Sequence, residues 1–208
     1  MSHLQIDIGP KKPYVSAMKT ERTRSKLIQA LRDEVRFSGE FSVEAVTKRA
    51  GMSVPTFYNY FANREDALIA ACRAFMEEVV AVTKEKTSIS KLLQRGLEQT
   101  IEDWISIVSG FFRTNAAFAL LLQAKLAQSE ELVKIYKIHE TQVIDLYREF
   151  VELGQAAGKV RTGSAPEIAE FLNITIQSWR HPLVIKSEPG SELHAEMTRS
   201  MALMLRPQ

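Results

Sequence analysis

Apolar residues recur along this chain at spacings of three and four, the period of an α-helix. The first such stripe consists of Leu27, Leu31 and Val35, and Gly39 follows it as a stop signal. Alternation of apolar and polar positions, the pattern of a half-buried strand, does not extend over any useful length. The pattern therefore predicts an all-α protein with a first helix over residues 19–37. Residues 1–18 carry Gly9, Pro10 and Pro13 and predict a flexible N-terminal arm.

Helix-capping residues divide the next part of the chain into two short helices and one long helix. Ser42 starts a helix that ends near Ala50, and Gly51 follows it as the natural left-handed turn residue. A second short helix starts at Ser53, with a proline in its first turn, where a missing N–H does little harm. Asn63 caps the longer helix, in a variant of the capping box.

The remainder of the chain has the pattern of longer helices separated by Gly and Pro. Gly158 follows one apolar stripe, Pro182 breaks another, and a loop with Pro189 and Gly190 precedes the last. No internal repeat is evident. The spacing predicts helices over residues 90–112, 115–127, 129–157, 166–180 and 192–205.

Two short helices joined by a tight glycine-containing turn form a helix-turn-helix pattern. Val46 on the first helix can pack against Phe57 on the second, which leaves the outer face of the second helix free. That face carries amide, hydroxyl and small apolar groups, which suit base edges and thymine methyl groups in a major groove. The pattern favours double-stranded DNA as a partner, and a helical hairpin with a polar outer face is the alternative.

The run FSVEAVTKRAGMSVPTFYNYFANREDAL at residues 41–68 resembles the DNA-binding signature of the TetR (tetracycline repressor) family. The AGMS turn, the TFYNYF helix and the NREDAL start of the next helix carry the resemblance, which is dense over residues 22–70. Over residues 80–208 the chain resembles the family mainly in its all-helical architecture and its length. The resemblance implies a helix-turn-helix head, a helical body that binds a small-molecule effector and forms a homodimer, and a pseudo-palindromic operator.

The resemblance also implies roles for matching positions of the head. Phe57 and Phe61 would be core residues. Glu44 departs from the family's frequent basic or polar residue, and it would point away from phosphate or contact a cytosine amine. The basic residues near the N-terminus have two interpretations, a solvated tail and a contact with DNA. The implied DNA-binding residues are Ser42, Lys48, Ser53, Val54, Pro55, Thr56, Tyr58, Asn59, Tyr60 and Arg64.

The charge distribution agrees with a polyanionic partner at one end of the chain. Net charge is only +2, but residues 1–64 hold 11 Lys and Arg against 6 Asp and Glu, whereas the rest holds 16 against 19. A solvated basic helix would give the same count, so the charge supports the DNA interpretation without deciding it.

Aromatic and amide side chains of the body suggest an effector pocket. A single aromatic residue on an inward stripe is explained by packing in the core. Asn173 and Gln177, however, share one face of a mostly apolar helix, as the polar groups that orient a ligand in a pocket do. His139 lies on an apolar face, where it is either a satisfied core histidine or a ligand contact. The candidate ligand-binding residues are Trp104, Val108, Phe111, Phe118, Tyr136, His139, Tyr147, Asn173 and Gln177.

Apolar stripes on the last two predicted helices suggest a homodimer interface. A two-fold axis would present two helix-turn-helix heads to half-sites about 34–36 Å apart. The alternative is that both stripes pack inside their own subunit. The candidate interface residues are Leu172, Ile176, Trp179, Leu193, Met197, Met201 and Met204.

Other classes of protein find little support in the sequence. The four histidines are scattered without metal-ligand spacing, and no nucleophile, phosphate-loop or dinucleotide motif occurs, so we expect no metal, no cofactor and no catalysis. The longest dense apolar stretch, residues 118–122, is too short for a membrane span. Residues 1–19 lack the apolar core of a secretory signal, and Cys72 is the only cysteine, which suits a reducing cytoplasm.

These observations predict a cytoplasmic DNA-binding regulator with three parts: an arm at residues 1–18, a helix-turn-helix domain at 19–64 and an effector-binding and dimerisation domain at 65–208. We expect a repressor that a small molecule releases from its operator. Two alternatives remain open: a DNA-binding regulator controlled by a protein partner, and an all-helical enzyme or adaptor that does not bind DNA.

Overall fold

The computed structural model describes residues 13–207, and every regular element within them is a helix. The all-α prediction is confirmed. The chain divides into two compact units, with the boundary between Ala71 and Cys72. Residues 1–12, which make up most of the predicted arm, lie outside the described residues.

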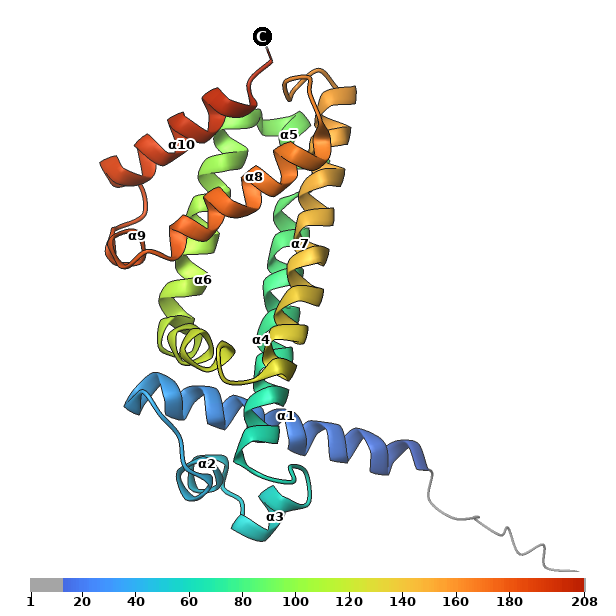
Figure 1. Ribbon diagram of the computed structural model, residues 1–208, viewed down its shortest axis with the longest axis vertical. Helices are drawn as coiled ribbons and strands as arrows, with labels where there is room; N and C mark the ends of the chain where they lie inside the picture. The colour runs from blue at the N-terminus through green and yellow to red at the C-terminus, as the bar shows by residue number, and fades with distance from the viewer. Residues whose placement is uncertain (1–12, 208) are drawn as a thin grey trace, which may run out of the picture. The chain divides into compact units, whose positions relative to one another are not determined.

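Unit 1 contains α1 (Pro13–Ser38), α2 (Val43–Ala50), α3 (Val54–Tyr58) and the first turns of α4 (Arg64–Lys86) (Figure 1). The boundaries of α2 and α3 follow the predicted caps. α1, however, begins before the predicted start at Lys19, so residues 13–18 are helical and not part of an arm. Proline at the start of a helix is compatible with this, because the first N–H groups of a helix have no intrahelical acceptor.

The core of unit 1 is built from the apolar stripe of α1 and from buried side chains of α2 and α3. Leu27 and Val35 of α1 are fully buried, as are Val46 of α2 and Phe57 of α3. α1 contacts α2, and α2 contacts α3. The predicted stripe of α1 is therefore buried, and it supports the helix-turn-helix.

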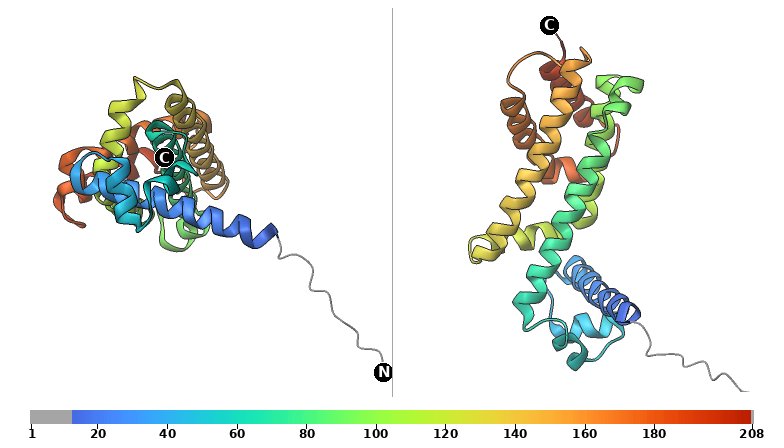
Figure 2. Two further views of the ribbon diagram at one scale, coloured as in Figure 1. Left: turned by 90° about the horizontal axis from the view of Figure 1, so that it is seen from below. Right: turned by 90° about the vertical axis from the view of Figure 1, so that its right-hand side faces the viewer.

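Unit 2 contains the rest of α4 and seven further helical elements between Cys72 and Pro207 (Figures 1 and 2). α7 runs alongside the part of α4 that belongs to this unit, and Arg73 of α4 pairs with Glu131 of α7 at 3.6 Å. The elements are α5 (Ile89–Arg95), α6 (Leu97–Leu126), α7 (Glu130–Ala156), α8 (Ala165–Gln177), the 3-10 helix η1 (Ser178–Arg180), α9 (Pro182–Lys186) and α10 (Glu192–Leu205).

The division of residues 90–127 into helices also differs from the sequence prediction. The predicted helices over residues 90–112 and 115–127 are instead α5 and a long α6, which passes through Arg113 and Thr114 without a break. The break lies at Gly96, whose φ of 80° is a left-handed value that suits glycine. Sequence pattern alone missed it because apolar spacing continues across that residue.

The unbroken α6 also corrects the expectation about apolar length. By length and composition alone, α6 is long and apolar enough to cross a membrane. One such helix is weak evidence, because core helices of soluble proteins pass the same test. In this fold α6 contacts α5, α7, α9 and α10, and its Ile101, Trp104 and Ile105 lie in the core of unit 2.

Candidate functional site

The turn between α2 and α3 fixes the geometry of the helix-turn-helix. Ser42 caps α2, because its hydroxyl accepts a hydrogen bond from the Ala45 N–H at 3.1 Å. Gly51 ends α2 in the left-handed conformation with φ 65°, and the next N–H, that of Met52, donates to the Thr47 carbonyl at 2.8 Å. These bonds satisfy the ends of two helices too short to be stable alone.

α3 is a single capped turn with a polar outer surface. The Ser53 hydroxyl accepts from the Thr56 N–H at 3.3 Å and lies 2.8 Å from the Thr56 hydroxyl. Tyr58 is 53% exposed, and Asn59 is also exposed. Asn59 is the C-cap residue that ends the helix. The exposed hydroxyl, amide and phenol groups are those that DNA-contacting helices use.

Two phenylalanines anchor α3 from beneath. Phe57 and Phe61 are buried, with ring centroids 5.1 Å apart. Their predicted core role is confirmed. Because the buried side of the helix is fixed by aromatic packing, the outer positions are held at defined places on the surface of unit 1.

Some basic side chains of unit 1 contact other side chains of the unit, whereas Lys48 is exposed to solvent. The Arg64 guanidinium lies over the Phe41 ring, 4.5 Å from its centroid, and Arg49 pairs with Glu34 at 2.7 Å. Lys48 is exposed on the last turn of α2. Glu44 is also exposed, on the first turn of the same helix. Lys48 therefore offers a cation to a phosphate without leaving an ion pair among the described residues.

All ten predicted DNA-binding residues lie between Ser42 and Arg64, within unit 1. Their contact with DNA stays a prediction. Sequence reasoning did not consider Arg49, which has a basic side chain one residue after Lys48 and is held by Glu34. Its place in the last turn of α2 was the available signal.

A small cavity in unit 2 brings together six of the nine predicted ligand-binding residues. Its volume is about 40 Å³, and it lies among side chains of α4, α6, α7 and α8. Its described walls are mostly apolar, with polar groups from Thr83 and Glu140 in addition to the predicted residues. The predicted residues that line it are Val108, Phe111, Tyr136, Tyr147, Asn173 and Gln177.

The polar wall of this cavity centres on a carboxylate that sequence reasoning missed. Glu140 Oε1 accepts from Asn173 Nδ2 at 3.3 Å and from Gln177 Nε2 at 3.0 Å. Glu140 lies four residues after Tyr136 and three before Val143, all on the cavity side of α7. That spacing is visible in the sequence, whereas the sequence prediction names the adjacent His139.

A larger cleft of about 1110 Å³ adjoins the small cavity. Met76, Phe112, Tyr136 and Gln177 line both spaces. The cleft is bounded by α4, by the C-terminal half of α6 and by α9, and its walls are mainly apolar. Such a volume accommodates a drug-sized molecule. No residue of α9 was among those predicted to bind a ligand, so the sequence prediction missed this wall of the cleft.

Three predicted ligand-binding residues line neither space. The indole N–H of Trp104 donates to the Lys86 carbonyl at 2.9 Å, and its ring packs on Phe150. Phe118 packs against Phe75, and His139 Nδ1 lies 2.8 Å from the Ile135 carbonyl of its own helix. These three are core residues, because their helices turn them away from the cavities into side-chain packing.

The predicted dimer stripe packs largely inside its own subunit. Leu172, Ile176, Trp179 and Met201 are buried in the core of unit 2, which is the alternative that the sequence left open. Met197 and Met204 pack against that core, and only Leu193 is exposed. The stripes of α8 and α10 face inward because α6 and α7 cover them. The exposed apolar side chains of α8 and α10, in addition to Leu193, are Phe171, Ile174 and Leu203.

Comparison with known proteins agrees with this architecture. Residues 39–72 match the family model of bacterial regulatory proteins of the tetR family. A TetR transcription regulator from Haloarcula marismortui is 13% identical, with a TM-score of 0.70 over 89% of this chain and 100% of that chain. No curated protein sequence matches the chain.

Two further solved structures share the fold. NemR from E. coli, in its reduced form, is 16% identical, with a TM-score of 0.68 over 88% of this chain and 97% of that one. FadR from Bacillus subtilis, in complex with stearoyl-CoA, is 17% identical, with a TM-score of 0.63 over 86% and 98%. At these identities the likeness establishes the fold, and the function must be argued from the residues of this chain.

Proposed function

We propose that this chain, whose N-terminal domain belongs to the tetR family of bacterial regulatory proteins, is a transcriptional repressor that a small-molecule effector releases from its operator. The observation that carries the proposal is α3: one capped turn, anchored by Phe57 and Phe61, with Tyr58 and Asn59 outward. A helix so short contributes little to a core and presents most of its side chains to a partner. Its groups match the donors and acceptors of a major groove.

The DNA contacts divide into two kinds. Thr56 and Asn59 have the chemistry to contact base edges, with Val54 and Pro55 against thymine methyl groups. Tyr58, Tyr60, Lys48 and Arg64 contact phosphates, together with the N-terminal N–H groups of α2 and α3 beside Ser42 and Ser53. Phosphate contacts supply affinity and base contacts supply specificity.

The repressor acts as a homodimer. One head offers a single short helix to DNA, which is little base contact for a specific site, whereas two heads related by a two-fold axis contact two half-sites of a pseudo-palindrome. We assign the interface to three exposed apolar side chains of α8 and α10, namely Phe171, Ile174 and Leu203. An isologous contact of this kind places the same residues on both sides of the axis.

Effector control is supported by the small cavity and the adjoining cleft in unit 2. FadR, which shares the fold, was solved with stearoyl-CoA bound, so a chain of this fold takes up a small molecule. Release requires that the effector bind the DNA-incompetent state more tightly than the DNA-competent one. A protein partner in place of the effector is the second candidate, and the cleft favours the small molecule.

The test is selection of binding sites from random DNA with the full chain, followed by a gel-shift assay. We expect a pseudo-palindromic site, weakened by the double change Thr56→Ala, Asn59→Ala. Lys137→Ala, on the exposed side of α7, is the control and should leave the affinity unchanged. Failure to select any DNA would favour the enzyme or adaptor alternative. If the double variant kept its affinity for the operator, α3 would not be the helix that contacts the bases.

A further inference from the structure

The carboxylate of Glu140 is only partly satisfied by the protein. Asn173 and Gln177 both donate to Oε1, and among the described residues Glu140 makes no other hydrogen bond or ion pair. Both amides come from α8, so they hold the carboxylate of α7 in one orientation. The second oxygen, Oε2, remains available as an acceptor.

The walls around Glu140 contain no compensating cation among the described residues. The small cavity is lined by valine, phenylalanine, tyrosine and similar side chains, and no Lys, Arg or His is among them. A carboxylate beside apolar walls loses hydration and is stabilised by any donor or positive charge that reaches it. A second anion in the same cavity would instead be repelled at short range.

The space beside Glu140 fits a small cationic group. A volume of about 40 Å³ holds roughly three water molecules, and therefore an ammonium group. The same cavity shares Met76, Phe112, Tyr136 and Gln177 with the large cleft. An amphiphile can therefore place its head beside Glu140 and its carbon skeleton against the apolar walls of the cleft.

We propose that the effector is an apolar cation, a hydrophobic amine whose ammonium group binds Glu140 Oε2 while its hydrocarbon part occupies the cleft. This assignment rests on the proposed effector-released repressor and names the chemistry that its pocket selects. Asn173 and Gln177 act as positioning residues, because they bind the carboxylate and not the ammonium group. The charge of Glu140 thus selects amines over fatty acids of the same length.

Two basic side chains of the cleft do not change this assignment. His181 and Lys186 also line the cleft, but both are exposed to solvent. Charges in water are screened, whereas Glu140 lies at a partly buried cavity wall. An anionic effector would place its head near Lys186 and leave Glu140 unpaired.

Calorimetric titration of the full chain at neutral pH with octylamine, octanol and octanoate tests the proposal. The three probes share one hydrocarbon chain and differ in head-group charge. We expect octylamine to bind the unmodified protein most tightly and to lose roughly tenfold or more in affinity in Glu140→Gln. Glu149→Gln, an exposed acid on the same helix, is the matched control and should bind octylamine as the unmodified protein does.

Three outcomes would overturn the assignment: tighter binding of octanoate than of octylamine, octylamine affinity unchanged in Glu140→Gln, or no binding of any of the three probes. Operator binding, measured separately by gel shift, distinguishes these failures from failure of the repressor proposal. Release of the operator by octanoate but not by octylamine would reject the cationic effector and keep the repressor. Thermal unfolding of Glu140→Gln checks that the variant is folded.

Discussion

The indole N–H of Trp104 donates a hydrogen bond to the backbone carbonyl of Lys86 at 2.9 Å, which joins α6 to the C-terminal end of α4. The last carbonyls of a helix lack intrahelical donors, so this bond satisfies one of them inside the core. Trp104 itself is buried. The same residue, Lys86, carries its side chain into the protein, where it is only 4% exposed.

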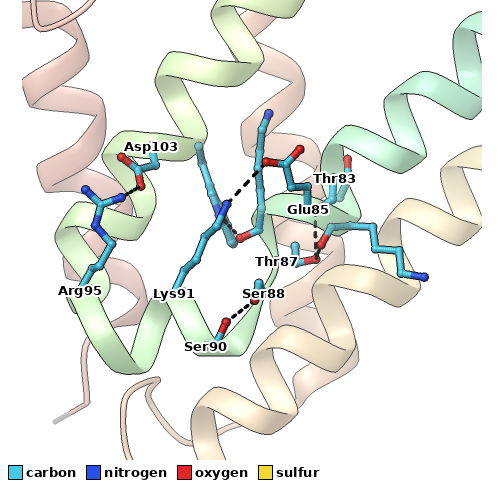
Figure 3. A network of polar contacts seen from close by, with 11 residues as sticks. Thr83, Glu85, Thr87, Ser88, Ser90, Lys91, Arg95 and Asp103 are labelled. Carbon is cyan, nitrogen blue, oxygen red and sulfur yellow. Dashed lines mark hydrogen bonds and ion pairs between the residues drawn. The ribbon is translucent and has the colours of Figure 1, made fainter.

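The ammonium nitrogen of Lys86 is buried without a hydrogen-bond partner among the described residues. Figure 3 shows the nearby turn between α4 and α5, where Lys91 pairs with Glu85 at 3.8 Å and the Ser88 and Ser90 hydroxyls lie 2.7 Å apart. Burial lowers the pKa of Lys86 from its ordinary 10.5 to about 7; Glu85 raises this pKa and Lys91 lowers it by smaller amounts. The buried amine therefore opposes folding while it is charged.

Replacement of Lys86 by methionine should stabilise the protein near neutral pH. Between pH 10.5 and about 7 the unfolded chain binds a proton at Lys86 that the folded chain does not, so the stability of the unmodified protein falls as the pH falls through this window. Lys86→Met removes that loss. We expect a gain in the free energy of unfolding on the order of a few kcal/mol near pH 7, measured by urea unfolding at fixed protein concentration.

The gain should shrink as the pH rises through 10.5 and approach zero above it, where Lys86 is neutral in the unfolded chain as well as in the folded chain. Lys84→Met, at an exposed position of the same helix, is the control and should change stability little at either pH. A gain of equal size at both pH values would mean that Lys86→Met acts through packing and not through charge.

Asn59 and Tyr58 should affect DNA binding in different ways. Asn59→Ala should cost about 1–3 kcal/mol of binding free energy at one base position and relax specificity there, because the amide can contact a base edge. Tyr58→Phe removes a hydroxyl that we assign to phosphate, so it should weaken binding to all sequences more evenly. Gel shifts on the selected operator and on single-base variants of it measure both effects. If Asn59→Ala weakened binding to all sequences equally, Asn59 would contact phosphate and not a base edge.

A charge on the outer face of α8 should separate the dimer without unfolding the chain. Ile174 is 66% exposed, so Ile174→Glu leaves the core intact and opposes an apolar interface. We expect a monomer in sedimentation at micromolar concentration and loss of operator binding. Ile138→Glu, on an exposed position of α7, is the control and should remain dimeric.

Met201 provides the contrasting case, because it is buried in the core of unit 2. Met201→Glu should unfold the chain, since a buried unpaired carboxylate costs several kcal/mol. If Met201→Glu gave a folded monomer, the result would support the interface that the sequence predicts on the apolar stripe of α10. Circular dichroism separates unfolding from dissociation.

The Cys72 thiol should react slowly with alkylating reagents in the folded protein. Burial raises the pKa of Cys72 from 9.0 to about 11, while Arg73 lowers it by less. The thiolate is the reactive form, so at neutral pH the native chain should react on the order of a hundredfold more slowly than the same chain in denaturant. Timed alkylation followed by mass spectrometry measures the ratio. Equal rates would show that the thiol is accessible and ionised as in a free cysteine.

The helix-turn-helix was predictable from sequence because its determinants are local. Ser42, Gly51 and Ser53 act on backbone groups within a few residues of themselves, so their capping roles were visible in the order of residue types. The same locality explains the correct boundaries of the final helix, residues 192–205. The break at Gly96 was missed because the apolar spacing on either side continues across it.

The pocket was predictable only in part. Aromatic and amide positions on inward stripes identified Tyr136, Asn173 and Gln177, but periodicity does not distinguish a residue that lines a space from one that fills it. Trp104 and Phe118 have the same spacing and fill the core. The sequence did not indicate Glu140 as a pocket residue, because a charged side chain is ordinarily solvated. Only the approach of α8 to α7 brings two amides within hydrogen-bond distance of its carboxylate.

The sequence by itself determined the all-α class, the capped turn of the helix-turn-helix head and the side chains that this head presents. Each of these depends on contacts within one or two helical turns, where the order of residues specifies the geometry. Tertiary structure decided which apolar stripes are buried, where the cavity lies and that Lys86 is enclosed without a partner. Those properties depend on helices far apart in the chain, and the position at which they pack is not encoded in the period of any one of them.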